Sequence, residues 1–340
     1  MMMPTDLILG VGIVSAAWGG TAIIRRIAIR GALLDVPNAR SSHQIPTPRG
    51  GGMAFVGVFL LFLAVWGYPS LPHRLWIGLL GAGVLVAWVG FWDDLGHVSA
   101  KWRLAAHFAA AIWGLVWVGG LPPIELFGFL VNLSWVGHGL ALLYLVWVLN
   151  FFNFMDGIDG IASVETISIC IGMAILLGVA GGSVMMVPIG LAAAVAGFLV
   201  WNFPKAKIFM GDAGSGFLGL ILSLFSVWGA HIRPGFLWAV VVLMGVFVVD
   251  ATVTLLRRIA RGKRPDTAHR NHAYQYAATR YNSHVPVTLG VLAINILWLF
   301  PIALAVGTGR IDGTLGVIVA YLPLIALAIK FNAGAPQTDH

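Results

Sequence analysis

The chain has 340 residues, of which 59% are hydrophobic and only 10% are charged, and its mean hydropathy is +0.91. A water-soluble protein of this length carries far more charge, so the composition excludes an ordinary soluble enzyme and predicts an integral membrane protein. The formal net charge of +7 does not indicate nucleic acid as a partner, because in a membrane protein the placement of charges matters more than their sum.

Apolar runs of about 17–22 residues, each long enough to cross a bilayer, recur along the whole sequence. We expect the first to be a retained helix and not a signal peptide, since no lysine or arginine precedes it. Eleven such runs predict an all-α fold and a single polytopic membrane domain over residues 1–340. They lie near residues 6–24, 51–69, 75–92, 103–120, 138–153, 160–181, 183–201, 214–231, 236–256, 286–306 and 313–331. The connection 121–137 predicts a small hairpin on the outer surface.

The basic residues orient these runs. With the N-terminus outside, the inside segments contain 17 of the 20 lysine and arginine residues, and the outside segments contain only Arg74, Arg233 and Arg310. Because positively charged loops stay in the cytoplasm, we expect a periplasmic N-terminus and a cytoplasmic C-terminus. The predicted active face is then formed by the cytoplasmic loops 25–50, 93–103, 154–160, 202–213 and 257–285.

Five of the thirteen acidic residues lie at the predicted cytoplasmic ends of three runs. They are Asp93, Asp94, Asp156, Asp159 and Asp212. A carboxylate at a membrane edge is costly to desolvate unless it meets a cation, a partner or water. A divalent metal that holds a phosphorylated substrate would be such a partner, so the clustering predicts metal-dependent chemistry on phosphates. Helix caps and solvated loop ends are the simpler alternatives.

The segment 150–160 has the densest polar pattern. Four polar residues recur every three positions: Asn150, Asn153, Asp156 and Asp159. This spacing keeps neighbours on one face of a helix end, and Gly157 and Gly160 would let a backbone or a phosphate approach closely. A polar helix cap followed by a glycine explains one aspartate but not four polar groups in register.

The segment 209–215 opens the eighth run. Its sequence is Phe209-Met-Gly-Asp212-Ala-Gly-Ser215, and its glycines suit a tight turn whose backbone N–H groups, with the helix N-terminus, favour an anion. A plain N-cap role for Asp212 is the alternative.

Two basic cytoplasmic loops complete the pattern. His269 and His272, with Arg270 between them, predict a phosphate clamp, whereas a zinc site is disfavoured because no cysteine accompanies them. Arg40, His43 and Arg49 in the loop 25–50 are placed to meet a lipid phosphate that arrives from the bilayer.

Asp250 lies inside an apolar run, where a carboxylate is expensive. Two interpretations stay open for it, a hydrogen bond to another helix and a direct chemical role.

In their order, spacing and side of the membrane, these motifs resemble those of the bacterial polyprenyl-phosphate N-acetylhexosamine-1-phosphate transferases, glycosyltransferase family 4. The resemblance runs from about Asp35 to Gln275. It implies transfer of N-acetylhexosamine 1-phosphate from a UDP-N-acetylhexosamine to undecaprenyl phosphate, with release of UMP, in the bacterial inner membrane. It also implies Mg²⁺ as the cofactor, with Mn²⁺ as an alternative, and a homodimer.

The resemblance assigns roles to residues at matching positions. Asp212 and Asn153 match metal ligands, and Asp93 and Asp94 match a pair that binds and deprotonates the lipid phosphate. Further catalytic positions are matched by Asp156, Lys101, His269 and His272. The positions around the nucleotide sugar are matched by Asp159, Asn202, Phe209, Gly157 and Arg270, with Phe209 placed to stack on uracil.

Two departures argue against a muramoyl-pentapeptide substrate. Arg270 and Asn271 interrupt the three successive histidines of that translocase, and Ser42 stands where many relatives have a lysine. The remaining motif forms look most like the subgroup that initiates O-antigen, so we expect the first membrane step of lipopolysaccharide O-antigen or another surface polysaccharide. The identity of the N-acetylhexosamine stays open.

Other functions fit the pattern less well. A muramoyl-pentapeptide-type transferase is the nearest alternative. A transporter of lipid-linked or anionic solutes would need acids at mid-membrane depth in several runs, and only Asp250 is clearly there. A CDP-alcohol phosphotransferase would need one compact run of acids and glycines in a single helix pair.

Overall fold

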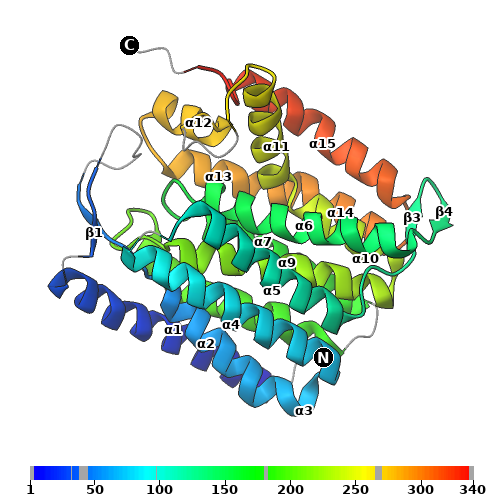
Figure 1. Cartoon of the computed structure of the whole chain (residues 1–340), viewed down its shortest axis with the longest axis horizontal. Coiled ribbons are helices and arrows are strands. Elements are labelled where there is room, and N and C mark those ends of the chain that lie inside the picture. The colour runs from blue at the N-terminus through cyan, green and yellow to red at the C-terminus, as the bar shows by residue number, and fades with distance from the viewer. Residues whose placement is uncertain are drawn as a thin grey trace.

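The computed structural model describes residues 4–31, 33–37, 45–96, 98–179, 183–264 and 270–336. Long helices lie side by side in one bundle, with a small two-stranded sheet near each end (Figure 1). The uninterrupted long helices are α1 (Pro4–Arg30), α4 (His73–Gly96), α5 (Ala100–Val118), α6 (Ser134–Met155), α7 (Ile161–Val179), α8 (Met186–Asn202), α9 (Asp212–Ile232) and α15 (Gly313–Lys330).

Two further helical stretches contain a wide π-helical turn. One consists of α2 (Gly52–Phe62), η1 (Leu63–Gly67) and α3 (Tyr68–Ser70), and the other of α13 (Val285–Ile294), η3 (Asn295–Leu299) and α14 (Phe300–Gly307). Each wide turn comes just before a proline, Pro69 or Pro301. Proline has no N–H and its ring clashes with the carbonyl four residues earlier, so a local widening lets the helix continue past it.

One stretch is broken. Helices α10 (Pro234–Leu243) and α11 (Gly245–Ile259) meet at Met244 with a bend of 71°. The short helix α12 (Ala273–Tyr281) follows α11, and a 3₁₀ turn, η2 (Ser183–Met185), precedes α8.

The helices confirm an all-α membrane fold, although the count of eleven spans is not reached. Within the described ranges, eight helices are long and apolar enough to cross a bilayer, or nine if the bent pair is one span. Two of the predicted runs, helices α5 and α8, do not meet the length and hydropathy expected of a membrane span. Helix α8 has 17 residues, and α5 begins with the charged Lys101 and Arg103.

Helix α9 lies at the centre of the bundle and is buried along nearly its whole length. Helix α4 approaches its first turn very closely, because a Cβ added at Gly90 would lie 2.4 Å from the Cα of Ala213. Only glycine permits this contact, which brings the C-terminal end of α4 to the N-terminus of α9.

Short strands close the two ends of the bundle. At one end β1 (Leu34–Asp35) pairs antiparallel with β2 (Thr47–Pro48). At the other, the predicted hairpin is present as β3 (Ile124–Leu126) and β4 (Phe129–Val131), with Glu125 opposite Leu130. A carboxylate oxygen of Asp312 accepts a hydrogen bond from the Gly128 N–H at 2.8 Å and ties this hairpin to the start of α15.

Candidate active site

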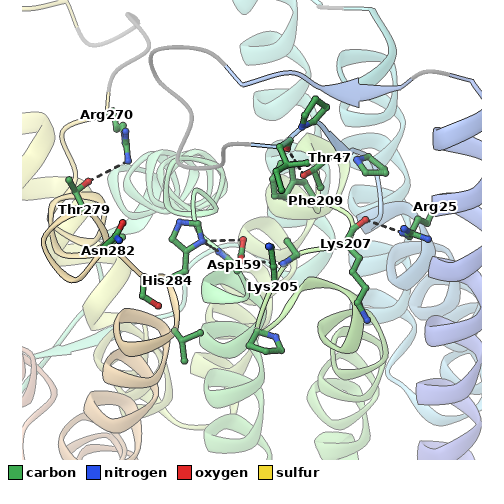
Figure 2. Close-up of a pocket in the computed structure, with 18 residues that line it drawn as sticks. Arg25, Thr47, Asp159, Lys205, Lys207, Phe209, Arg270, Thr279, Asn282 and His284 are labelled. Atoms are coloured by element: carbon green, nitrogen blue, oxygen red, sulfur yellow. Dashed lines mark hydrogen bonds and ion pairs between the residues drawn. The ribbon is translucent and has the colours of Figure 1, made fainter.

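A pocket of about 810 Å³ opens at the end of the bundle where α6, α8 and α12 finish. Figure 2 shows that its walls come from distant parts of the chain, with Arg25, Thr47 and Lys207 on one side and Arg270, Thr279 and His284 on the other. Four of its side chains are basic: Arg25, Lys205, Lys207 and Arg270. This charge suits an anionic ligand.

Phe209 and Asp159 also line this pocket (Figure 2). The Asp159 carboxylate lies 3.2 Å from Nδ1 of His284 and accepts a hydrogen bond from the Ala206 N–H at 3.1 Å. A flat aromatic ring beside a fixed carboxylate matches what a nucleobase needs, a stacking surface and an acceptor at its edge.

A backbone ladder separates the pocket from a group of carboxylates. The Phe209 N–H donates to the Pro48 carbonyl at 2.8 Å, and the Gly51 N–H donates to the Phe209 carbonyl at 2.9 Å. Thr47, Pro48 and Phe209 line the pocket, whereas Arg49, the residue after Pro48, pairs with Asp94 and with Asp212, three residues after Phe209. The two features are therefore neighbours.

Asp94 caps helix α9. Its two oxygens accept hydrogen bonds from the N–H groups of Asp212 at 2.9 Å and Ala213 at 3.2 Å, and Nε of Arg49 lies 2.9 Å away. A carboxylate in this place satisfies backbone donors that the helix cannot pair itself and complements the positive end of the helix dipole. Asp94 thus joins α4 to α9.

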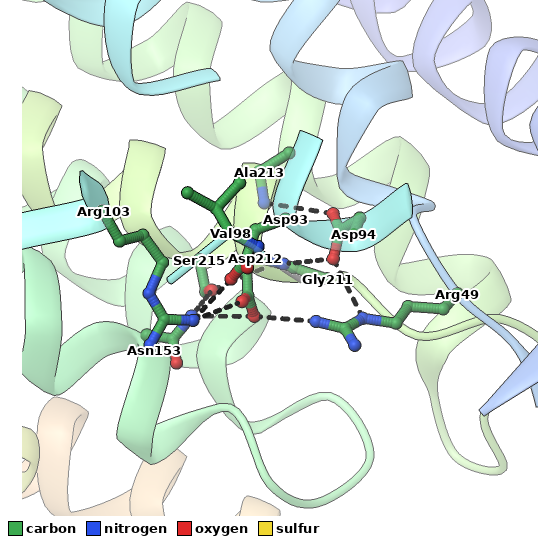
Figure 3. A network of polar contacts seen from close by, with 10 residues as sticks. All are labelled: Arg49, Asp93, Asp94, Val98, Arg103, Asn153, Gly211, Asp212, Ala213 and Ser215. Carbon is green, nitrogen blue, oxygen red and sulfur yellow. Dashed lines mark hydrogen bonds and ion pairs between the residues drawn. The ribbon is translucent and has the colours of Figure 1, made fainter. Parts of the chain in front are cut away.

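Asp93 faces the other way. One oxygen accepts from the Val98 N–H at 2.8 Å, and the other pairs with Nη1 of Arg103, which also lies 3.4 Å from Asp212 (Figure 3). From the sequence, Lys101 and Arg103 are both candidates for the cation beside the aspartate pair, and the resemblance implies that Lys101 lies close to the phosphates. Lys101 is exposed, and Arg103, two residues further along α5, is the cation that pairs with Asp93.

Asp212 is the centre of the group (Figure 3). Its Oδ1 lies 3.0 Å from Nη2 of Arg49 and accepts from the Asn153 amide at 3.0 Å, and its Oδ2 meets Arg103. The Asn153 amide also donates to the Ser215 hydroxyl at 3.1 Å. Three segments, the loop before α2, helix α5 and helix α6, thus send polar groups to one carboxylate.

The group is rich in negative charge. Burial raises the pKa of the nearby Asp156 carboxyl well above its usual range, and the charge of Asp212 adds to that rise. Burial lowers the pKa of the Arg49 guanidinium, but Asp212 and Asp94 outweigh it, and the net pKa lies above its usual range. A bound cation would relieve this crowding of carboxylates.

The donors suit one particular kind of metal. Among the residues that the structure describes, no three His, Cys, Asp or Glu side chains are grouped to hold an ion. Mg²⁺ prefers oxygen ligands and is commonly held by one or two carboxylates together with substrate phosphates. Asp212 and the adjacent Asp93 offer such carboxylates. The Asn153 amide, whose N–H group donates to Asp212, would present its oxygen after rotation by half a turn, so the residues fit Mg²⁺ shared with a phosphorylated substrate.

Comparison with known proteins places the chain in a family. Residues 76–230, which include Asp93, Asn153 and Asp212, match the model of glycosyl transferase family 4. A probable undecaprenyl-phosphate N-acetylglucosaminyl 1-phosphate transferase of Bacillus subtilis is 33% identical over 264 residues, which is 74% of this chain and 72% of that protein. The chain belongs to glycosyl transferase family 4.

Two other relatives show the breadth of the family. A decaprenyl-phosphate N-acetylglucosaminephosphotransferase of Mycolicibacterium smegmatis is 29% identical over 93% of this chain and 87% of its own length. A phospho-N-acetylmuramoyl-pentapeptide-transferase of a Synechococcus strain is 33% identical over 64% of this chain and 65% of its own.

Not every family 4 position lies where the sequence predicted. Asn202 is 3% exposed and does not line the pocket, because its amide accepts from the Gly160 N–H at 2.9 Å and donates to the Ile208 carbonyl at 3.1 Å. The space beside Gly157 is taken by Tyr274, whose hydroxyl would lie 2.1 Å from an added Cβ. Both residues shape the walls, and a direct contact with the nucleotide stays a prediction.

The predicted polar stripe over Asn150–Asp159 is wrong. Helix α6 ends at Met155, so Asp156 and Asp159 leave its face. Asn150 turns back to the Val146 carbonyl of its own helix at 2.7 Å, Asn153 reaches Asp212, and Asp159 faces the pocket. A spacing of three residues predicts one face of a helix end, whereas the helix stops at Met155 and the chain turns after it.

Asp250 hydrogen-bonds another helix, which was one of its two interpretations. It accepts from the N–H groups of Ala273 at 2.9 Å and Tyr274 at 3.0 Å, the first residues of α12, and lies 3.3 Å from Nδ1 of the buried His272. His272 is therefore engaged at the start of α12. Arg40, His43 and His269 lie outside the described residues.

The sequence offers Lys101 and Arg103, on the same cytoplasmic turn, as cations to counter one of the two aspartates, and the structure pairs Arg103 with Asp93. Sequence reasoning missed another set of cations. Arg25, Lys205 and Lys207 were counted only for orientation, since nothing local shows that α1 meets the loop after α8. The Nε of Arg25 donates to the Lys207 carbonyl at 3.1 Å, a contact across 182 positions.

Proposed function

We propose that this protein transfers N-acetylhexosamine 1-phosphate from a UDP-sugar to a polyprenyl phosphate, undecaprenyl phosphate in the first instance, and releases UMP. The observation that carries the proposal is Asp212, a carboxylate between two arginines, next to Asp93 and beside a basic pocket with an aromatic wall. The names of the family 4 relatives support the reaction class and favour UDP-N-acetylglucosamine as the donor to test first.

The proposed setting is the inner membrane of a bacterium. Eleven spans with a periplasmic N-terminus and a cytoplasmic C-terminus would place the pocket and the carboxylates on the cytoplasmic face, where UDP-sugars are found. The distribution of 17 of the 20 basic residues on that side supports this orientation. We propose the same role as expected from the sequence, the first membrane step of O-antigen or another surface polysaccharide.

In the proposed reaction an oxygen of the lipid phosphate attacks the sugar-linked phosphorus of the UDP-sugar. A new P–O bond forms, the bond to the bridging oxygen breaks, and UMP leaves with that electron pair. A phosphate monoester has a second pKa of about 6, so the nucleophile is already mostly dianionic near neutral pH. Asp93 therefore serves mainly to position it, and a strong general base is not required.

A bound Mg²⁺ would supply electrostatic stabilisation of the charge that develops on the departing UMP. Asp212 and Asn153 would hold it, with Asp93 beside them. Arg49 and Arg103 now pair with Asp212. With Asp212 engaged in holding the cation, Arg49 and Arg103 would lose this shared partner and would be able to bind the phosphates of the lipid and of the donor.

The test uses the purified protein in detergent with undecaprenyl phosphate and separate UDP-sugars, and follows UMP release with and without Mg²⁺. The panel includes UDP-N-acetylglucosamine, UDP-N-acetylgalactosamine and UDP-N-acetylmuramoyl-pentapeptide, and Asp212→Ala is the control. Release that needs lipid, metal and Asp212 supports the proposal. Release only with the pentapeptide donor would replace it by the muramoyl-type reaction, for which the Synechococcus relative speaks.

A further inference from the structure

Glu165 is a buried carboxyl group on α7, outside the group of carboxylates that surrounds Asp212. It lies in the second turn of α7, is 0% exposed, and accepts a hydrogen bond of 2.6 Å from the side-chain amide of Asn295, which is 2% exposed. Asn295 begins the wide turn η3. The amide N–H of Phe247, in the first turn of α11 after the 71° bend, lies within hydrogen-bonding reach of the same carboxyl group.

One side-chain oxygen of Glu165 and one of Asn295 have no hydrogen-bond partner. They are Oε1 of Glu165 and Oδ1 of Asn295, and both are buried. If the glutamate were ionised, both atoms would be acceptors without a hydrogen-bonded donor, and a carboxylate would lie inside an apolar bundle without an ion pair to any described lysine, arginine or histidine. Unsatisfied buried polar atoms are costly, and an uncompensated charge in a membrane segment costs more.

We propose that Glu165 is held as a neutral carboxylic acid in a reciprocal pair with Asn295. The Asn295 N–H donates to Oε2, and a proton on Oε1 donates in return to the Asn295 carbonyl oxygen. A single proton thus satisfies both unpartnered atoms and removes the charge. Exchanging the amide O and N of Asn295 leaves this conclusion unchanged, since both side chains are fully bonded only when the acid carries its proton.

The pair holds α13 against α7. Thr288 lies seven residues, or two helical turns, before Asn295 on the same face, and its hydroxyl donates to the Asp159 carbonyl at 2.8 Å. His284, at the start of the same helix, meets the Asp159 side chain at the pocket. Glu165 is therefore a positioning residue: it fixes the inner end of a helix whose outer end forms a pocket wall.

Three single variants and one double variant test the pair. Glu165→Gln is the neutral mimic, because a glutamine can donate to the Asn295 carbonyl and accept from its amide. We expect it to retain the thermal midpoint and the UDP-sugar KM of the parent protein. Glu165→Leu and Asn295→Leu each leave one buried polar partner alone, so both should lower the midpoint by several degrees. Leucine at both positions should recover most of that loss, since no unpaired polar group is left.

The protonation state has its own readout. Infrared difference spectra of the parent protein against Glu165→Gln should contain the carbonyl band of a protonated carboxylic acid near neutral pH, and that band should be absent for the variant. No such band, or a Glu165→Gln protein as unstable as Glu165→Leu, would mean that the glutamate is ionised and would overturn the proposal.

A kinetic readout connects the pair to the pocket, and it rests on the proposed function. Glu165→Leu should raise the UDP-sugar KM several-fold with a smaller change in kcat, and Glu165→Gln should restore it. The stability and infrared measurements need no substrate, so they judge the acid–amide pair even if the proposed reaction fails.

Discussion

The adjacent residues Asp93 and Asp94 make different contacts in this site. Both oxygens of Asp94 are used by the N-terminus of α9 and by Arg49. Asp93 instead faces Arg103 and Asp212. A sequence pattern of two aspartates treats them alike, but the structure assigns the cap of α9 to Asp94 and pairs Asp93 with Arg103.

Replacing each aspartate by asparagine should separate the effects of these contacts. Asp94→Asn should cost about 1–2 kcal/mol of stability, as the loss of a helix cap does, and lower activity as a consequence. Asp93→Asn should lower kcat by roughly 10²-fold or more, through loss of an electrostatic contact, with little change in thermal midpoint. Thermal unfolding and UMP release on the same preparations measure both. Equal loss of stability in the two variants would refute the division.

Substitution of Arg49 should change the affinities for the metal ion and for the UDP-sugar in opposite directions. In Arg49→Gln, Asp212 loses a competing cation, so Mn²⁺ used as a probe should bind more tightly in the absence of substrate. The UDP-sugar should bind more weakly, because a phosphate contact is gone. Mn²⁺ resonance titration and UDP-sugar calorimetry measure the two affinities. Arg26→Gln, an exposed arginine on α1, is the matched control. Weaker binding of both ligands would contradict the exchange.

At the scale of elements, the site depends on how closely α4 meets α9. A methyl group at Gly90 would lie 2.4 Å from the Cα of Ala213 and 2.6 Å from its N atom, and backbone cannot rotate away. The cap made by Asp94 lies one helical turn further along α4. The glycine therefore sets the distance between the carboxylates of two helices.

Gly90→Ala should accordingly lose both stability and activity, although alanine favours helices more than glycine does by about 1 kcal/mol. The matched control is Gly57→Ala on α2, where nothing lies within 4 Å of the added methyl group. We expect the control to be neutral or slightly stabilising. Circular dichroism melting and UMP release compare the two, and a Gly90→Ala protein that behaves like the control would show that α4 can shift freely.

Much of this arrangement follows from local sequence, and the rest does not. Apolar length predicts the long helices, and the turn residues near Phe127 predict the hairpin. The end of α6 at Met155 was missed, because a spacing of three looks helical whether or not the chain turns. The capping of α12 by Asp250 and the meeting of Arg25 with Lys207 are contacts between segments distant in sequence, and no local pattern encodes a partner.

At the scale of the whole molecule, the pocket gathers cations from both ends of the chain. Arg25 comes from α1, Lys205 and Lys207 from the loop after α8, and Arg270 from the segment before α12. Family 4 residues 76–230 contain the carboxylates but neither of these arginines. The pocket is thus completed by segments outside the matched region.

Removing one outlying cation should affect binding more than chemistry. Arg25→Gln should raise the KM for the UDP-sugar several-fold, leave kcat nearly unchanged, and reduce the dependence of KM on salt, because a charge contact to an anionic ligand is screened by ions. Initial rates at low and high ionic strength test this. Arg30→Gln, exposed near the end of the same helix, is the control. A fall in kcat alone would place Arg25 outside the binding site.

The cap that Asp94 makes on α9 also has a consequence for biosynthesis. The carboxylate and the Asp212 amide that it accepts from are 118 positions apart, so Asp94 emerges from the ribosome long before the amides that it caps. Until α9 has been synthesised, Asp94 lies at the end of α4 without the N–H groups of Asp212 and Ala213 that later donate to it. The candidate site therefore forms only when α9 lies beside α4, so the placement of the central helix and the assembly of this carboxylate group are a single event.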